Sequence, residues 1–259
     1  MKQRILAILL SLTMIFTLVP TAIADETGTG GTAPQGTENE DAMQLNVGGA
    51  VALDLSNGAI IISATGYQQG DGAETAYTGP YTISQAGSDA VQNTITVTGG
   101  DQHITLNGVN IDLSAQEEGI PCAFAIEGGN ATVALADGTE NTLKSGLIDD
   151  GTKGISCAGL WVGKNASLTI TGDSGKLIAV GGGTGSHNFG NAAKAAGIGA
   201  SRVYGSVYDT KYNTVGNITI TGGVINATGS KASGYYGPGI GKQRCGCPVC
   251  AGRTKCKTM

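Results

Sequence analysis

Apolar and polar residues alternate along most of this chain in short runs that are bounded by glycine. The alternation is clearest in Ile95-Thr96-Val97, Ile104-Thr105-Leu106 and Ile218-Thr219-Ile220, where apolar side chains would point to one side and threonines to the other. Such a pattern predicts short β-strands with one buried face. The expected strands are 59–63, 94–98, 103–106, 109–113, 123–126, 131–135, 160–162, 168–171, 177–180, 218–221 and 224–227.

One sequence motif occurs twice. Residues 167–181 and 217–229 share Thr-Ile-Thr-Gly and a following apolar run, and each is followed by a Gly-Ile-Gly corner, at 197–199 and 239–241. A β-sandwich built from hairpins does not require a repeated motif. In a solenoid, by contrast, equivalent positions of successive coils stack on one another, and the motif repeats with them. The repeats therefore predict a parallel β-helix, with inserts at about 181–195 and 201–214 that leave the coil on one flank.

Composition supports the all-β prediction. The chain has 44 glycines in 259 residues, one Trp and three Phe, and this share of glycine is far above the usual value of about 7 %. No Gly-X-Y period is present, so a collagen is excluded, and the alternation of Ile, Val and Thr argues against disorder over the body of the chain. A turn-dense β-domain is what remains.

The sequence divides into four segments. Residues 1–24 have Lys2 and Arg4 before an apolar run and end in a small-residue cleavage site, which is typical of a signal peptide. Residues 25–43 are predicted to be a flexible acidic linker, 44–241 the β-helix domain, and 242–259 a basic, cysteine-rich tail that is either native or a truncated end. No later run is apolar enough to cross a membrane, so we expect a secreted protein without a membrane span.

Charge is distributed unevenly along the chain. Residues 25–143 contain 16 Asp and Glu and no Lys or Arg, whereas 144–241 contain 8 basic and 4 acidic residues. Phosphate backbones need cationic partners, so the acidic half disfavours nucleic acid. The same field suits calcium, a cationic partner or plain solubility, and the sequence does not choose among them.

The residues in 93–111 and 131–146, together with the Ile-Thr-Gly and Gly-Ile-Gly phrases, resemble the clostridial-type secreted proteins described as carbohydrate-binding domain-containing. The resemblance covers roughly 45–241. It implies a pectate-lyase-like, right-handed, single-stranded parallel β-helix that binds extracellular polysaccharide, with calcium bound in some members. Similar Gly-Ile-Gly repeats also occur in large bacterial surface proteins of unknown role.

Aromatic side chains are the first candidates for sugar contacts, because pyranose rings stack on flat apolar surfaces. The candidates are Tyr204, Tyr208 and Tyr212, four residues apart in one insert; Tyr235 and Tyr236 at the equivalent place one repeat later; and Trp161, which alternates outward if its neighbours point inward. The alternative is that these rings cap the coil ends or brace the inserts.

Carboxylates supply the candidates for calcium and for catalysis. Asp112, Glu117 and Glu118 lie within seven positions of one another and could ligate calcium at an irregular site, or they are solvated turn residues. A lyase or hydrolase would need a base and clustered carboxylates, for which the β-domain offers Arg202 and the adjacent pair Asp149 and Asp150. Neighbouring strand residues point to opposite faces, so that pair would need a turn to act together.

The six cysteines fall into two groups. Cys122 and Cys157 are isolated on strand-like segments and are either buried thiols or, in a secreted protein, a disulfide. The second group lies in the tail, where the spacing allows one zinc ion or two short disulfides. Its members are Cys245, Cys247, Cys250 and Cys256.

The sequence thus predicts a secreted, non-catalytic β-helix module that binds extracellular polysaccharide or mediates surface adhesion, including association with a cell wall. Calcium is the one cofactor that the sequence suggests. Two alternatives remain: a polysaccharide lyase or glycoside hydrolase on the same fold, and a structural fragment of a larger surface protein.

Overall fold

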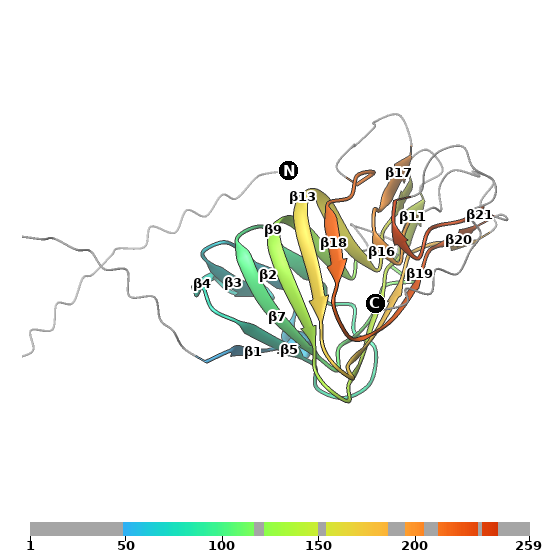
Figure 1. Cartoon of the computed structure of the whole chain (residues 1–259). Coiled ribbons are helices and arrows are strands. Elements are labelled where there is room, and N and C mark those ends of the chain that lie inside the picture. The colour runs from blue at the N-terminus through green and yellow to red at the C-terminus, as the bar shows by residue number, and fades with distance from the viewer. Residues whose placement is uncertain are drawn as a thin grey trace, which may run out of the picture. The chain divides into compact units, whose positions relative to one another are not determined.

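The alternating runs form strands, and the protein is all-β as predicted. The computed structural model describes residues 49–116, 122–149, 154–185, 195–204, 212–232 and 235–242. In these residues every regular element is a β-strand except one 3-10 turn, η1 (Leu55–Asn57) (Figure 1). None of the described elements is a helix long and apolar enough to cross a membrane. The predicted signal peptide and linker lie outside the described residues, as does the tail after Lys242.

Most strands belong to three layers in which every neighbour is parallel. The first layer contains β2 (Ile60–Ile62), β6 (Ile95–Val97), the start of β9 (Phe124–Leu135), the start of β13 (Leu160–Thr171), β16 (Ile198–Gly199) and β22 (Ile240–Gly241). The second contains β1 (Val51–Asp54), β5 (Tyr81–Ser84), β7 (Asp101–Asn107), the ends of β9 and β13, and β18 (Asn217–Ile220). The third contains β8 (Asn110–Asp112), β10 (Glu140–Lys144), β14 (Lys176–Val180) and β19 (Val224–Thr228).

Two long strands join the first and second layers into one curled sheet (Figure 1). β9 and β13 each have twelve residues and cover two predicted strands apiece. β9 passes through Gly129, whose φ of +76° lies in the left-handed region, and a Cβ there would collide with the backbone oxygen of Gly100. β13 shifts register between Val162 and Asn165. These local irregularities let one strand serve both layers.

The two copies of the repeated sequence motif lie side by side in the structure. β18 pairs in register with β13, so that Ile218 lies beside Leu168, and β19 pairs in register with β14. The two Gly-Ile-Gly corners also meet, because Ile198 of β16 pairs with Ile240 of β22. Each of the passes that begin at β6, β9, β13 and β16 therefore adds one strand to each layer.

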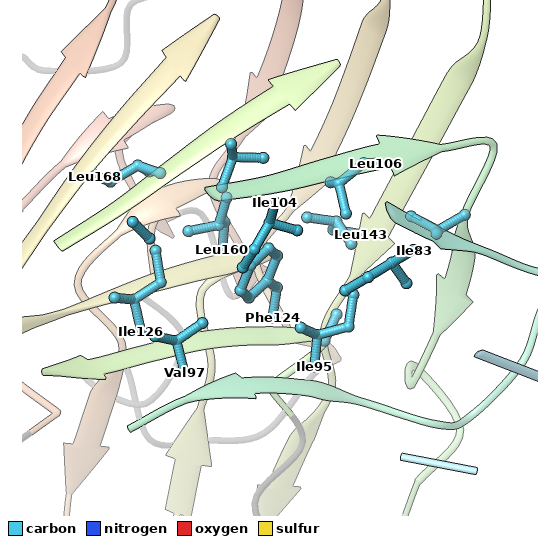
Figure 2. Packing of buried hydrophobic residues seen from close by; sticks show 14 of the residues in the cluster. Ile83, Ile95, Val97, Ile104, Leu106, Phe124, Ile126, Leu143, Leu160 and Leu168 are labelled. Carbon is cyan, nitrogen blue, oxygen red and sulfur yellow. The ribbon is translucent and has the colours of Figure 1, made fainter. Parts of the chain in front are cut away.

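Inward side chains at equivalent positions of successive passes form the hydrophobic core. One row runs across the first layer through six residues whose register is continuous: Ile60, Ile95, Phe124, Leu160, Ile198 and Ile240. Its first five members are fully buried, and Figure 2 shows Ile95, Phe124 and Leu160 packed against Ile104 of the second layer. Burying a large aliphatic side chain contributes about 1.5–3 kcal/mol, so these rows stabilise the stacking directly.

One inward position of the third layer is polar and acts as a link between passes. Asn141 of β10 is fully buried. Its Oδ1 accepts hydrogen bonds from the backbone N–H groups of Gly108 (2.9 Å) and Val109 (3.1 Å), and its Nδ2 donates to the Lys176 carbonyl at 3.2 Å. Because its partners lie on the preceding and the following pass, the amide is satisfied only when three passes are in register.

Hairpins cover the N-terminal end of the layers. β2 pairs antiparallel with β3 (Gly66–Gln69), which pairs with β4 (Thr75–Ala76). Tyr81 lies between Tyr67 and Tyr77, with ring centroids 5.9 and 5.3 Å away, and burial raises its pKa to about 12. Its hydroxyl donates to the Tyr77 carbonyl at 3.0 Å. This aromatic group closes the end of the core.

Two small sheets lie outside the three layers. β11 (Leu147–Asp149), β12 (Gly154–Ser156) and β17 (Arg202–Tyr204) form an antiparallel sheet. β15 (Thr184–Gly185), β20 (Lys231–Ala232) and β21 (Tyr235–Tyr236) form the other. Both are built from segments that connect strands of the three layers.

Two adjacent residues of β13 test the assignment of inward and outward faces. Leu168 is 1 % exposed, whereas the side chain of Thr169 points outward and is half-buried. We expect Leu168→Ala to lower the free energy of unfolding by about 2–5 kcal/mol, and Thr169→Ala to change it by about 0.5 kcal/mol or less. Urea denaturation followed by circular dichroism measures both. Equal effects of the two substitutions would contradict the assigned faces.

Candidate functional site

The first candidate, Trp161, braces an insert and does not stand on an open face. Its neighbours Leu160 and Val162 point into the main core, so its ring points the other way, as the alternation predicts. However, the ring is only 1 % exposed. Tyr212 covers it, with ring centroids 4.8 Å apart, and is itself 6 % exposed. Neither ring is presented to solvent, which agrees with the bracing interpretation of these two residues.

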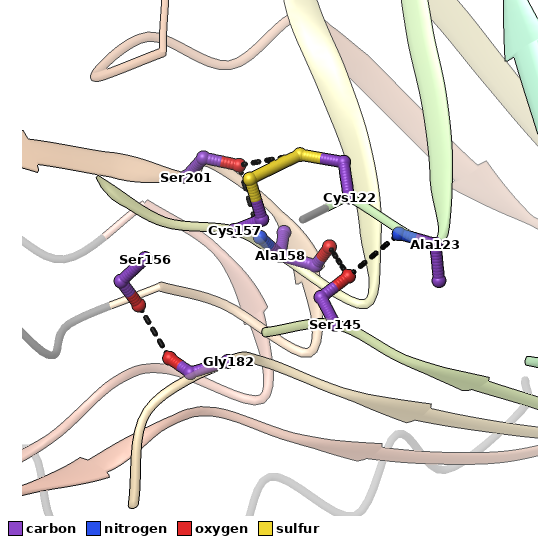
Figure 3. The surroundings of a disulfide bond; sticks show 8 residues. All are labelled: Cys122, Ala123, Ser145, Ser156, Cys157, Ala158, Gly182 and Ser201. Carbon is purple, nitrogen blue, oxygen red and sulfur yellow. Dashed lines mark hydrogen bonds between the residues drawn. A yellow bond between two sulfur atoms is a disulfide. The ribbon is translucent and has the colours of Figure 1, made fainter. Parts of the chain in front are cut away.

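A disulfide lies beneath these rings. Cys122 and Cys157 are bonded to each other, with Cα atoms 5.1 Å apart (Figure 3). Both cysteines belong to a second buried cluster, which comprises Cys122, Ala125, Cys157, Ala158, Trp161, Ala196 and Tyr212. The disulfide joins two successive passes just before they enter the first layer. It therefore resolves the alternatives left by the sequence in favour of a bonded pair.

Buried serines hold the same region together. Ser145 Oγ donates to the Ala158 carbonyl at 2.6 Å and accepts from the Ala123 N–H at 2.8 Å, and Ser201 Oγ accepts from the Ala158 N–H at 2.9 Å (Figure 3). Each hydroxyl pairs backbone groups that the ladder leaves unpaired. The base of the inserts is thus fixed by a disulfide, two stacked rings and these serines.

The remaining tyrosines differ in what the structure shows of them. Tyr236 is 45 % exposed, and the Lys231 Nζ lies 5.5 Å from its ring centroid, within the range of a cation–π contact. Tyr204 and Tyr235 lie on β17 and β21, for which only the backbone is described at these positions, and Tyr208 is outside the described residues. Tyr236 is therefore the predicted sugar-binding ring that the structure places in contact with solvent.

The predicted calcium ligand Asp112 is held in an ion pair. Its Oδ2 lies 2.8 Å from Lys144 Nζ on the adjacent strand. Partial burial raises the pKa of Asp112, but hydrogen bonds from Lys144 and Ser114 and the charge of Lys144 outweigh this effect and hold the pKa below its usual value. Glu117 and Glu118 lie outside the described residues. Within the part of the chain that the structure describes, no three His, Cys, Asp or Glu side chains gather as metal ligands.

The residues of the enzyme alternative are not brought together in the described strands. Arg202 of β17 pairs with Ser156, which pairs with Leu147. Asp149 falls at the other end of the same sheet, opposite Gly154, and Asp150 is outside the described residues. The register therefore places Arg202 and Asp149 on opposite ends of three-residue strands.

The second layer has an outward face that the search for aromatic residues missed. Its side chains are hydroxyls, amides and few charges, arranged in rows across five parallel strands. We call this surface the hydroxyl face; its residues are Thr82, Ser84, Asp101, His103, Thr105, Asn107, Asn130, Thr132, Ala134, Ser167, Thr169, Thr171, Asn217 and Thr219.

The rows of the hydroxyl face are in exact backbone register. One row runs through His103, Thr132, Thr169 and Thr219, and another through Thr82, Thr105, Ala134 and Thr171. Parallel neighbours repeat about every 4.8 Å across the strands, and same-face residues about every 6.6 Å along them. None of the fourteen residues is Lys or Arg. The Thr-x-Thr spacing in the sequence was the signal for this array, but the register that aligns it comes only from the structure.

The tail cysteines Cys245, Cys247, Cys250 and Cys256 lie outside the described residues, so zinc and disulfide pairing among them stay predictions.

Comparison with protein families, with curated proteins and with solved structures finds no match to this chain.

The Asp112–Lys144 pair gives a pH-dependent prediction. Because the folded pKa of Asp112 lies below its unfolded value, the pair stabilises the protein above pH about 4 and loses this effect as the pH falls through the folded pKa. We expect Asp112→Asn to lower the free energy of unfolding at pH 7 by about 0.5 kcal/mol, as for other exposed pairs.

Urea denaturation of the wild type and Asp112→Asn at pH 7 and at pH 2.5 measures this difference, which should be smaller at the lower pH. Asp71→Asn, which alters an exposed acid elsewhere, is the control. A difference that stays constant with pH would contradict the assigned pair. Stabilisation by calcium that is present in the wild type and absent in Asp112→Asn would instead support the predicted calcium site.

Proposed function

We propose that this protein is a secreted, non-catalytic adhesion module that binds an uncharged extracellular polysaccharide along its hydroxyl face. The observation that carries the proposal is the in-register array of hydroxyl and amide side chains on β5, β7, β9, β13 and β18. The fold on which it rests is a right-handed, single-stranded parallel β-helix. In support of that fold, each of the passes that begin at β6, β9, β13 and β16 adds one parallel strand to each of three layers.

The chemistry of the face suits a polyhydroxylated partner. Threonine and serine hydroxyls donate and accept hydrogen bonds, and asparagine amides do both with separate atoms. A sugar chain presents the same mixture of donors and acceptors along its length. Since the rows are periodic in two directions, a polymer with a regular repeat can make the same contact several times, and weak contacts then add up.

Charge selects among polysaccharides. The hydroxyl face contains Asp101 and no Lys or Arg, and the first half of the mature sequence is strongly acidic. Polymers of uronic acid would therefore meet repulsion from the protein field. Neutral glycans meet none, so the proposal is limited to that class.

The rigidity of the face favours binding without a large loss of entropy. Six of its residues lie on β9 and β13, each of which pairs with strands on both sides. The Asn130 Nδ2 donates to Asp101 Oδ1 at 2.6 Å, so these two neighbouring side chains are already oriented. A surface that is ordered before binding loses little conformational freedom in the complex. Tyr236, exposed on β21, is a second contact candidate on a different part of the molecule.

Removal of hydroxyls without a change of shape tests the proposal. We expect the double substitution Thr132→Val and Thr169→Val to weaken binding of a neutral polysaccharide about tenfold, because two hydrogen bonds of about 0.5–1.5 kcal/mol each are lost. Thr142→Val is the matched control, since Thr142 is a half-buried, outward threonine of the third layer. Affinity electrophoresis in gels that contain neutral or uronate-rich polysaccharides measures the change.

The outcomes separate the proposals. Retardation in neutral gels that the double variant loses and Thr142→Val keeps supports the hydroxyl face. Retardation that Tyr236→Ala abolishes, while the double variant retains it, would move the site to the tyrosine hairpin. New reducing ends or unsaturated uronate in the gel would favour the enzyme alternative, and failure of every polysaccharide to retard the protein would contradict binding altogether.

A further inference from the structure

The dipeptide Asn-Gly occurs twice in this chain, at Asn57-Gly58 and at Asn107-Gly108. Glycine has no side chain to shield its backbone nitrogen, so this nitrogen can attack the amide carbon of the asparagine before it. Asn57 and Asn107 are both exposed. Sequence and exposure therefore give the two sites the same susceptibility, and any difference between them comes from how the glycine nitrogen is held.

The nitrogen of Gly108 is held firmly. Its N–H donates to Asn141 Oδ1 at 2.9 Å, and the Val109 N–H donates to the same oxygen at 3.1 Å. Asn141 is fully buried, and its Nδ2 donates to the Lys176 carbonyl at 3.2 Å, so the acceptor is itself fixed. Attack on the Asn107 side chain requires the Gly108 N–H to lose its proton and to turn away from Asn141. Both changes break a hydrogen bond inside the core.

The nitrogen of Gly58 is held weakly. Gly58 follows η1, and its N–H lies 3.4 Å from the Leu55 carbonyl oxygen, which is longer than the usual range of about 2.7–3.2 Å. The same oxygen accepts a shorter hydrogen bond, of 2.8 Å, from Asn93 Nδ2. The Leu55 carbonyl thus keeps a partner when Gly58 turns away, and freeing the Gly58 nitrogen costs little.

We propose that Asn57 is a site of spontaneous deamidation and that the Asn141 amide protects Asn107 from the same reaction. The Gly58 nitrogen forms a bond to Cγ of Asn57, and the bond from Cγ to Nδ2 breaks. The Nδ2 group leaves as ammonia with the proton from the Gly58 N–H. Water then opens the cyclic imide at one of its two carbonyls, which gives aspartate or isoaspartate at position 57.

The two positions differ in what the reaction would change. At Asn57 the product carries a negative charge, and isoaspartate also lengthens the main chain between η1 and β2, shortly before Ile60 begins the first core row. Asn107 belongs to the hydroxyl face, where the same reaction would add a second carboxylate beside Asp101 on β7. Asn141 therefore keeps the amide at that position neutral while it links three passes.

Ageing of the full-length protein in mildly alkaline buffer tests the inference. Samples taken over time are digested, and mass spectrometry measures the deamidated fraction of the peptides that contain Asn57 and Asn107. We expect Asn57 to convert at least about tenfold faster than Asn107 in the folded protein, because only Asn107 requires local opening of the core. In guanidinium chloride the two should convert at nearly equal rates.

Matched variants assign the cause. Asn57→Ser should remove the isoaspartate that forms in the folded protein, whereas Asn107→Ser should leave it. Asn141→Leu frees the Gly108 N–H and should raise the rate at Asn107 about tenfold, with Asn57 in the same sample as the internal standard and circular dichroism as the check on folding.

The rates decide the inference. Conversion of Asn107 as fast as Asn57 in the folded protein would overturn it, and so would a stable Asn57 under conditions that convert the unfolded chain. Continued protection of Asn107 in a folded Asn141→Leu variant would overturn the role given to Asn141. Should that variant not fold, the comparison within the wild type still decides. The measurement involves no polysaccharide, so its outcome is independent of the proposed function.

Discussion

In-register parallel pairing between successive passes of the chain is the constraint on which the rest of the structure depends. Once Ile95, Phe124 and Leu160 share a row, the remaining residues of these strands are assigned alternately to the surface and to the core. A register shift of one residue would move every inward side chain of a strand to the outer face. The pairing also explains why the sole buried amide of the third layer is tolerated: Asn141 is satisfied by groups on the passes before and after it.

The same register creates two kinds of surface. Over the second layer it aligns threonines and asparagines into the hydroxyl face, which is regular because the backbone beneath it is regular. Over the first layer the outward positions include Ala125 and Trp161, and these are covered by inserts through the Cys122–Cys157 disulfide and Tyr212. The molecule thus carries a regular polar surface on one layer and a braced, irregular one on another. The proposed function uses the first of these.

The sequence was sufficient for the strands whose alternation is strong. The strands predicted at 94–98, 177–180 and 224–227 agree with β6, β14 and β19 to within one residue at each end. The two copies of the repeated motif pair with each other. β5 and β10 were missed, because Tyr81–Ser84 and Glu140–Lys144 carry only two buried side chains each and polar residues dominate around them. The continuity of β9 and β13 was also missed, since glycines at a bend are indistinguishable from glycines at a turn in sequence alone.

The site was harder to predict for a physical reason. Outward alternation shows that Trp161 leaves the main core, but only the fold shows that Tyr212, distant in sequence, covers it. Likewise, the carboxylate of Asp112 meets Lys144 through a strand pairing that its own neighbours do not specify. The threonines of the hydroxyl face were visible as single pairs, yet their alignment depends on pairing across 50 residues, as between Thr169 and Thr219.

The measurement that tests the parallel register most directly is cross-linking of paired cysteine substitutions on β9 and β13. In the register described here, Asn130 lies beside Ser167, and Ala134 lies beside Thr171. Parallel neighbours are about 4.8 Å apart, whereas Asn130 and Thr171 are separated by four further residues, or roughly 13 Å along the strand. A short bifunctional reagent that alkylates thiols should therefore join Asn130→Cys to Ser167→Cys and fail to join Asn130→Cys to Thr171→Cys, with peptide mass spectrometry as the readout. The reverse result would show antiparallel strands and contradict the account.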